Sequence, residues 1–195
     1  MADYRLNGLD GDDQLTKARG SDPAGDSDAI PADLSAELCK SCGLCCSGAL
    51  FDYVPVDELE RPRLTELGFP VRTDPATGMR FDHPCARFEK GLCSVYPDRP
   101  QACRRFRCEL LIGVESGRMS ADRAHGIVLE AKAMVDEVRL LHGDDRPLLP
   151  QSWRERLRAW GSGKSAGRTD PTLLLQMTRL NVFLDRHFRS KAQRV

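Results

Sequence analysis

Eight cysteines, all between residues 39 and 108, constrain this chain more than any other feature of its sequence. Four of them lie in the run Cys39-Lys40-Ser41-Cys42-Gly43-Leu44-Cys45-Cys46. The other four are Cys85, Cys93, Cys103 and Cys108, and the chain beyond them contains none. Packing does not explain thiols crowded in this way. Because the thiolate is the form of cysteine that binds metals, the clustering indicates a thiolate-bound metal.

The N-terminal sequence bears on the compartment in which these thiols would work. It lacks the basic start and apolar run of a secretory signal. No apolar stretch approaches the roughly 20 residues that a membrane-spanning helix needs. We therefore expect a cytoplasmic protein without a membrane partner. Cysteines stay reduced in the cytosol, which favours metal binding over disulfides.

Charge is balanced over the 195 residues but unevenly distributed. Residues 1–60 carry four basic and 13 acidic side chains, whereas residues 146–195 carry 11 basic and three acidic ones. The two ends could attract each other, or the basic end could attract an acidic partner. Because the basic residues are dispersed along expected helices rather than clustered with aromatic residues, we do not expect nucleic acid. The expected partner is an unidentified redox protein or other protein.

Composition and periodicity divide the chain into three parts. Residues 1–35 are rich in Asp, Gly, Ser and Ala, and we expect this acidic segment to be disordered. Residues 36–118 show turn signals, a small hairpin over residues 79–96 and a short helical turn at Cys103, capped by Asp98. Residues 119–195 show helical periodicity. The predicted fold is α+β and mainly helical: a small, loop-rich cysteine domain stapled by metal, with a helical C-terminal region packing on it.

The helical region contains three predicted helices. The first begins near Ser120 and ends at Gly143, with apolar residues at three- and four-residue spacing. A shorter second helix is expected over residues 152–160. The third begins at Asp170-Pro171, a capping residue followed by a proline in the first turn. We interpret these as core-forming helices that supply the apolar surface the cysteine region lacks.

Soft thiolates select zinc, copper(I) and iron–sulfur clusters. The repeat Cys39-x2-Cys42-x2-Cys45 resembles the cysteine run of bacterial ferredoxins and favours a cluster, with [4Fe–4S] as the expected type. A tetrahedral zinc site would instead combine a pair such as Cys42 and Cys45 with two distant thiols. Cys46 follows Cys45 directly, and neighbouring side chains diverge, so the two are not expected to bind one ion in the same way. Eight thiols suit two four-thiolate sites, or one cluster with a second metal or a redox pair.

Two further groups could support such a site. Arg99, Arg104, Arg105 and Arg107 surround the last two cysteines. Arginine forks could offset the negative charge of a four-thiolate site, and we expect one or two of them to do so while the rest face solvent. His83 lies two residues before Cys85 and is a minor alternative ligand or an outer hydrogen-bond donor.

Several elements together resemble a known family. They are the run Cys39-x2-Cys42-x2-Cys45-Cys46, then His83-Pro84-Cys85, Cys93-Ser94-Val95-Tyr96-Pro97-Asp98-Arg99-Pro100 and Cys103-Arg104-Arg105-Phe106. This pattern, over residues 36–112, resembles the YkgJ-type CxxCxxCC cysteine-cluster family. That family is described as zinc- or iron-chelating and is related to flagellin lysine N-methylase. Cys108 looks like a subgroup feature. The resemblance implies metal or iron–sulfur binding.

The leading hypothesis is therefore an intracellular metal-binding protein that holds an iron–sulfur cluster or zinc through its eight cysteines. A cluster would suit an oxidoreductase or electron-transfer protein. One alternative is a zinc-stapled binding module without chemistry of its own. Another, by analogy with flagellin methylation, is a methyltransferase-like enzyme. The sequence identifies no catalytic residue.

Overall fold

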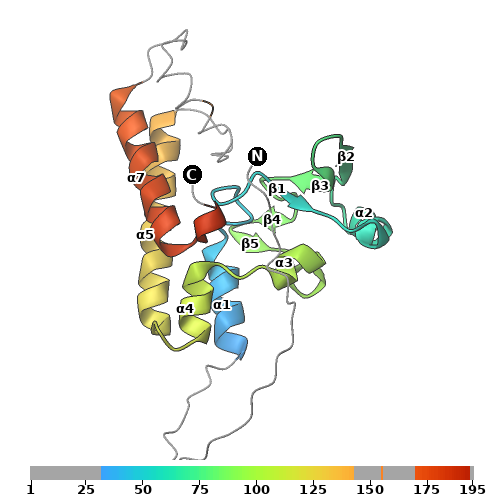
Figure 1. Ribbon diagram of the computed structural model, residues 1–195, viewed down its shortest axis with the longest axis horizontal. Coiled ribbons are helices and arrows are strands. Elements are labelled where there is room, and N and C mark those ends of the chain that lie inside the picture. Colours follow the sequence, from blue (N-terminus) through green and yellow to red (C-terminus); the bar gives the residue numbers. More distant parts are fainter. Residues whose placement is uncertain (1–31, 143–154, 156–169, 194–195) are drawn as a thin grey trace, which may run out of the picture.

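The computed structural model describes residues 32–142, Glu155 and residues 170–193. Four helices pack together on one side of the molecule: α1 (Ala32–Cys42), α4 (Glu109–Glu115), α5 (Ala121–His142) and α7 (Pro171–His187). On the other side lie two small sheets and the short helices α2 (Arg61–Glu66) and α3 (Gln101–Arg105) (Figure 1). The fold is thus α+β and mainly helical, as predicted. Within the described residues, no helix is both long and apolar enough to cross a membrane.

The larger sheet has three antiparallel strands in the order β1 (Tyr53–Pro55), β3 (Gly78–Asp82) and β2 (Arg72–Asp74). Pro55 cannot donate a hydrogen bond, and β1 accordingly lies at an edge of the sheet. The smaller sheet is a hairpin of β4 (Phe88–Glu89) and β5 (Leu92–Cys93). Its turn residues Lys90 and Gly91 both have positive φ, as two-residue hairpin turns require. The hairpin is shorter than the predicted 79–96, because β3 pairs with β1 and β2 instead.

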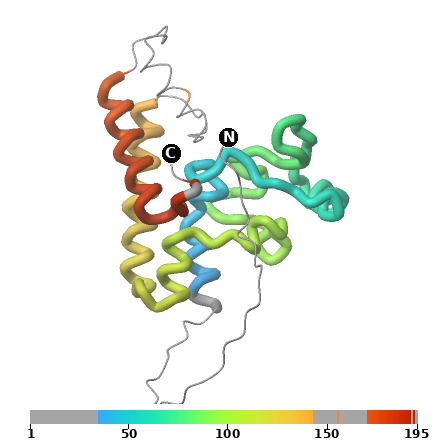
Figure 2. Tube along the Cα trace, viewed as in Figure 1, coloured from blue at the N-terminus to red at the C-terminus, as the bar shows by residue number. Residues whose placement is uncertain are grey.

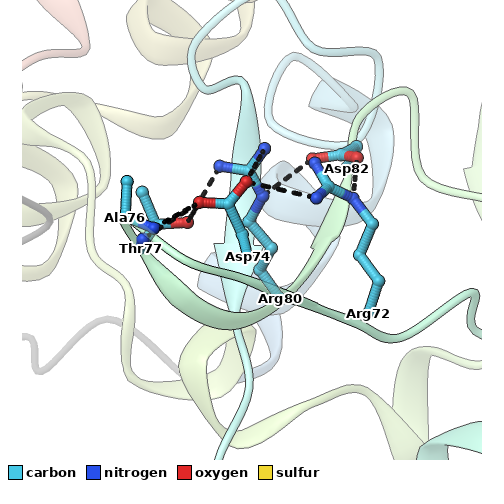
Figure 3. Close-up of polar contacts among 6 residues, drawn as sticks. All are labelled: Arg72, Asp74, Ala76, Thr77, Arg80 and Asp82. Atoms are coloured by element: carbon cyan, nitrogen blue, oxygen red, sulfur yellow. Dashed lines mark hydrogen bonds and ion pairs between the residues drawn. The ribbon is translucent and has the colours of Figure 1, made fainter.

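Charged side chains form a ladder on the three-stranded sheet (Figure 3). Arg72 Nε lies 2.7 Å from Asp82, and Arg80 Nε lies 3.1 Å from the same carboxylate. Asp74 contacts both arginines and accepts hydrogen bonds in the β2–β3 turn, one of them from the Thr77 hydroxyl at 3.0 Å. The Thr77 hydrogen bond is the largest of the interactions that lower the pKa of Asp74 to about 2. The ladder fixes the register of β2 against β3.

Three single-turn 3-10 helices complete the described chain: η1 (Glu58–Glu60), η2 (Tyr96–Asp98) and η3 (Lys191–Gln193). Asp57 caps η1 by accepting from the Leu59 N–H at 2.9 Å. The predicted cap of α3 by Asp98 is wrong, because Asp98 ends η2 and Pro100 precedes α3. The carboxylate of Glu60 accepts from the Gln101 N–H at 3.1 Å instead. A cap supplied from 41 residues away leaves no local sequence signal.

The two long C-terminal helices agree with their sequence signals. Helix α5 covers the predicted residues, and α7 begins at Pro171 with Asp170 accepting from the Thr172 N–H at 2.8 Å. The helix predicted over residues 152–160 lies outside the described residues, apart from Glu155. Figure 2 shows α5 and α7 running side by side, and they pack against each other.

Helices α1 and α4 have no counterpart among the predicted elements. Helix α1 begins at Ala32, inside the segment expected to be disordered, of which residues 1–31 lie outside the described part. It carries Cys39 and Cys42 in its last turns. Its inward positions Leu38 and Cys42 are four residues apart, so a cysteine takes the place of an apolar residue in the helical pattern. Helix α4 is short, and Leu110, Leu111 and Val114 form its buried side.

Two apolar cores hold these elements together. The larger core joins side chains from α1, α4, α5 and α7, including Leu38, Leu110 and Leu184. It therefore includes residues from both sides of the boundary expected at residue 119, and the division of the chain at that residue stays a prediction. The smaller core lies under the three-stranded sheet. Its buried members are Val54, Val56, Leu64, Phe69, Phe81 and Cys85.

Candidate metal centre

A tight turn after α1 presents two consecutive cysteines. Gly43 ends the helix with φ of +67°, and a Cβ at this position would lie 2.7 Å from the ring of Phe88. Only glycine suits both the positive φ and this close approach. The Gly48 N–H then bonds to the Cys45 carbonyl at 3.1 Å, and Ala49 bonds back to Leu44. The turn fixes the backbone around Cys45 and Cys46.

The eight thiols fall into two groups. The first thiol set consists of Cys39, Cys42, Cys45 and Cys108, and the second thiol set of Cys46, Cys85, Cys93 and Cys103. Three members of the first set, all except Cys39, pack against the larger core. Three members of the second set, all except Cys93, belong to the smaller core or pack against it. The division therefore follows the two cores.

Electrostatics within the first set support this grouping. Burial is the main reason that the pKa of Cys45 lies well above its usual range, and the charges of Cys108 and Cys42 follow in importance. Burial also raises the pKa of Cys42 to about 12, again with Cys108 as the strongest thiol neighbour. Cys108 is thus electrostatically close to the cysteine run, although 62 residues separate it from Cys46 in the numbering.

Cys108 caps α4. Its Sγ accepts a hydrogen bond from the Leu111 N–H at 3.4 Å, and the helix N-terminus favours negative charge there. Burial nevertheless raises the pKa of Cys108 to about 11, and this hydrogen bond only partly opposes the effect. The Leu111 N–H is placed to stabilise a thiolate at Cys108. Burial opposes ionisation, so a thiolate there needs a positive partner.

The second set is assembled from four places in the chain. The Cys85 N–H donates to the Cys46 carbonyl at 2.8 Å, Cys93 pairs with Phe88 across the β4–β5 hairpin, and α3 carries Cys103. Burial, followed by the charges of Cys85, Cys93 and Cys103, raises the pKa of Cys46. For Cys103 the corresponding causes are burial, Cys85 and Cys93, which together raise its pKa to about 12 although Arg99 opposes them.

All four thiols of the second set line one cavity of about 90 Å³. Cys39 and Cys45 of the first set also reach its wall. Cys39 is the exposed cysteine, and its charge raises the pKa of thiols in both sets, after burial and nearer neighbours. The two sets are therefore adjacent, with Cys39 at their border. Cys45 and Cys46 belong to different sets, in agreement with the expected divergence of neighbouring side chains.

The eight cysteine sulfur atoms are of a kind that binds metals, although they do not surround a common point as the ligands of one ion would. All eight cysteines are free, and thiolates gathered in a buried place repel each other unless a cation is present. Among the described residues, no three cysteine, histidine or carboxylate side chains stand in coordinating geometry. The structure therefore shows which cysteines lie near one another, and it contains no metal–sulfur distances.

His83 gives a second indication that the cavity suits a polar or metallic group. The side chain lines the cavity and is only 7% exposed, and within the described structure neither ring nitrogen has a partner in hydrogen-bond geometry. Burial lowers its pKa to about 4, although the nearby Cys46 carbonyl favours the protonated form. A buried neutral imidazole whose nitrogens lack well-aligned hydrogen bonds is costly, so a group in the cavity that bonds to it would reduce that cost.

Of the four arginines near Cys103, Arg99 is placed to offset negative charge. Its guanidinium lies 3.9 Å from the centre of the Tyr96 ring, and its charge lowers the pKa of Cys103 against the effect of burial. Arg104 and Arg105 are exposed, and Arg104 bonds to backbone carbonyls. Arg107 pairs with Glu115 at 3.1 Å. This agrees with the expectation that one or two of the four act on the thiols.

Two other cations near the thiols were not predicted. Arg87 opposes the effect of burial, which raises the pKa of Cys85. Lys132 has the same opposing effect on Cys42. Arg87 is two residues from a cysteine and could have been considered from the sequence. Lys132 lies on α5, where only the three-dimensional fold brings it to the cysteine run.

Residues 38–124 match one protein-family model, named CxxCxxCC and described as "Putative zinc- or iron-chelating domain". This part of the chain is therefore similar to the CxxCxxCC family. The match confirms the resemblance inferred from the cysteine pattern and supports metal binding by this part of the chain. Residues 38–124, called the CxxCxxCC domain below, contain all eight cysteines, so both thiol sets lie within this domain. The searches of curated proteins and of solved structures returned no match.

Proposed function

We propose that the CxxCxxCC domain binds two metal centres, one in each thiol set. The observation that carries this proposal is the separation of the cysteines by the core against which they pack. Each set contains four thiols, which is the number that a closed zinc site or a [4Fe–4S] cluster takes. A single centre would leave the four thiols of the other set gathered but protonated, with no part in metal binding.

We infer iron–sulfur clusters as the metal groups. The first set combines three cysteines at two-residue spacing with the distant Cys108, and Cys46 joins the other set. Bacterial ferredoxins with two clusters divide their cysteine run in a comparable way, since the fourth cysteine binds the other cluster. The cavity of about 90 Å³ beside the second set is several times the roughly 10–15 Å³ that one water needs, so it suits a polyatomic group better than one ion.

A bound iron–sulfur cluster supplies one-electron redox chemistry. The function that these features support is therefore electron transfer or a related redox role, with an unidentified redox protein as partner and the cytoplasm as the expected location. The residues of the chain bury the centres, and Arg87, Arg99 and Lys132 offset their negative charge. The charge of the surroundings and hydrogen bonds to sulfur set the reduction potential of such a centre.

Zinc is the second candidate. The family description names zinc beside iron, and four thiolates also suit a tetrahedral zinc site. With zinc in both sets, the protein would be a metal-stapled binding module without redox chemistry.

Two adjacent substitutions test the two-centre proposal. Cys45→Ser should remove the centre of the first set and leave that of the second, whereas Cys46→Ser should do the reverse. Anaerobic purification followed by iron, sulfide and zinc analysis, with absorption and electron paramagnetic resonance spectra, would count and identify the centres. Each variant should retain about half of the parent's metal with a different residual spectrum. Identical losses and spectra, or a parent protein without metal, would refute the proposal.

A further inference from the structure

The helices that follow the CxxCxxCC domain contact its cysteine-bearing segments at specific points. Helix α7 lies wholly outside the family match, as does Lys132 on α5. Both helices nevertheless share the larger core with three cysteines of the first thiol set. Polar contacts from these helices therefore indicate what the C-terminal region does for the metal centre.

Arg189, just after α7, is 1% exposed and holds the end of the cysteine turn. Its Nη2 donates to the Ala49 carbonyl at 3.1 Å, across 140 residues. Its Nη1 donates to Asp185 at 2.9 Å and to Asn181 at 3.0 Å, so the guanidinium is fixed from the α7 side. Ala49 closes the turn that contains Cys45 and Cys46. A planar guanidinium with several donors suits this bridging role better than a flexible ammonium.

The residue before Arg189 holds the other segment of the first set. The carbonyl of Phe188 accepts a hydrogen bond from the Glu109 N–H at 3.1 Å, and Glu109 directly follows Cys108. Phe188 itself is 1% exposed. Two consecutive residues after α7 thus join the cysteine turn to the segment that supplies Cys108.

A third contact lies at the start of the cysteine turn. Lys132 Nζ donates to the Ser41 carbonyl at 3.1 Å, one residue before Cys42. The side chain of Lys132 is exposed. Lys132 and Arg189 therefore bond to backbone carbonyls on either side of the segment that contains Cys42, Cys45 and Cys46.

We propose that Arg189 and Lys132 are positioning residues for the first thiol set, through which the C-terminal helices hold Cys42 and Cys45 in place relative to Cys108. This rests on the proposed function, in which that set binds a metal. Ligands held in place before the metal arrives lose less conformational freedom on binding. Of the second set, only Cys46 lies between these two contacts, whereas Cys85, Cys93 and Cys103 come from other segments, so this set depends less on Arg189 and Lys132.

An ordinary stabilising role for Arg189 would affect both sets alike, and this difference gives the test. The double variant Cys46→Ser/Cys103→Ser keeps the first set intact, and Cys42→Ser/Cys108→Ser keeps the second. Each background would be titrated anaerobically with Co²⁺, whose thiolate charge-transfer absorption reports the bonds formed, and circular dichroism would confirm helicity. Arg189→Met should weaken Co²⁺ binding about 10-fold in the first background, the low end of what outer partners of metal ligands contribute. Binding in the second background, in which Cys46 is the one ligand within the turn that Arg189 holds, should weaken much less.

Controls keep the result interpretable. Arg186→Met removes an exposed positive charge from α7, three residues before Arg189, and should change neither titration. Lys132→Met tests the exposed contact if Arg189→Met fails to fold, and it should weaken binding in the first background only, with Lys132→Arg restoring it. Equal losses in both backgrounds, or none in either, would overturn the inference. If neither background without helix substitutions binds Co²⁺, the proposed function fails, and the inference with it.

Discussion

Gly43 is the position where the fold offers the sharpest test of how the cysteine turn is built. Replacing it with alanine would place a Cβ on a residue with φ of +67°, which costs about 1–2 kcal/mol. The same Cβ would lie 2.7 Å from Cζ and 2.8 Å from Cε2 of Phe88. Overpacking of this kind costs about 1–3 kcal/mol, toward the lower end here because the ring of Phe88 is only partly buried and can move. The expected loss of stability is therefore about 2–4 kcal/mol.

Gly91 provides the matched control. Its φ is +81°, but an added Cβ meets nothing within 4 Å. Gly91→Ala should therefore cost only the backbone term of about 1–2 kcal/mol. Urea unfolding of both variants, under reducing conditions and at equal metal content, measures the difference.

A double variant isolates the contact itself. Phe88→Leu removes the distal ring atoms, so Gly43→Ala should destabilise the Phe88→Leu protein less than the parent. Because Phe88 pairs with Cys93 and Gly43 precedes Cys45, the clash pushes segments of both thiol sets apart. Gly43→Ala should therefore also lower metal content, and Gly91→Ala should not. Equal effects of the two alanines on stability would refute the reasoning.

Three further predictions address the cavity, the sheet and the N-terminal segment. His83→Phe removes the buried ring nitrogens and should weaken Co²⁺ binding by the second thiol set about 10-fold, whereas His125→Phe, at an exposed position on α5, should not. Because the pKa of Asp74 is lowered from 3.8 to about 2, its ionised form stabilises the fold above about pH 4. This stabilisation is lost as the pH falls through about 2. The difference in melting temperature between the parent and Asp74→Asn should therefore shrink from about pH 4 to about pH 2. A difference that stays constant over this range would contradict the prediction. Removing residues 1–30, which lack a pattern for burial, should leave metal content and cooperative unfolding unchanged.

The sequence predicts the long elements of this fold well because their signals are local and repeated. Helix α5 shows several turns of apolar periodicity, and α7 begins with a capping residue and a proline. Helix α1 lacks a clear apolar pattern because Cys42 stands in its buried face. Helix α4 gives little signal because it spans only Glu109–Glu115. Clustered cysteines indicate a metal site, and this signal obscures their contribution to the buried face of a helix.

In the candidate site, too, features set by neighbouring residues could be predicted, whereas contacts between residues far apart in the sequence could not. The divergence of Cys45 and Cys46 follows from backbone geometry, so their separation into two sets could be anticipated. The partners of each could not, because Cys108 and Cys85 reach the turn only through the packing of α4 and of the sheet. The same holds for Arg189 and Lys132, whose contacts with the cysteine turn span 140 and 91 residues. No spacing in the sequence encodes such distances.

Burial and metal binding act on these thiols in opposite directions. Burial raises the pKa of Cys42 and Cys103 to about 12, so at neutral pH the metal-free thiols hold their protons. A metal binds the thiolate, and its entry must therefore displace those protons. The same apolar packing that gathers the cysteines thus makes them poor anions when no metal is bound. A bound cation removes this conflict because it neutralises the thiolates without exposing either core to water. Packing of the cores and loading of the centres are consequently linked, with metal release favoured as the pH falls.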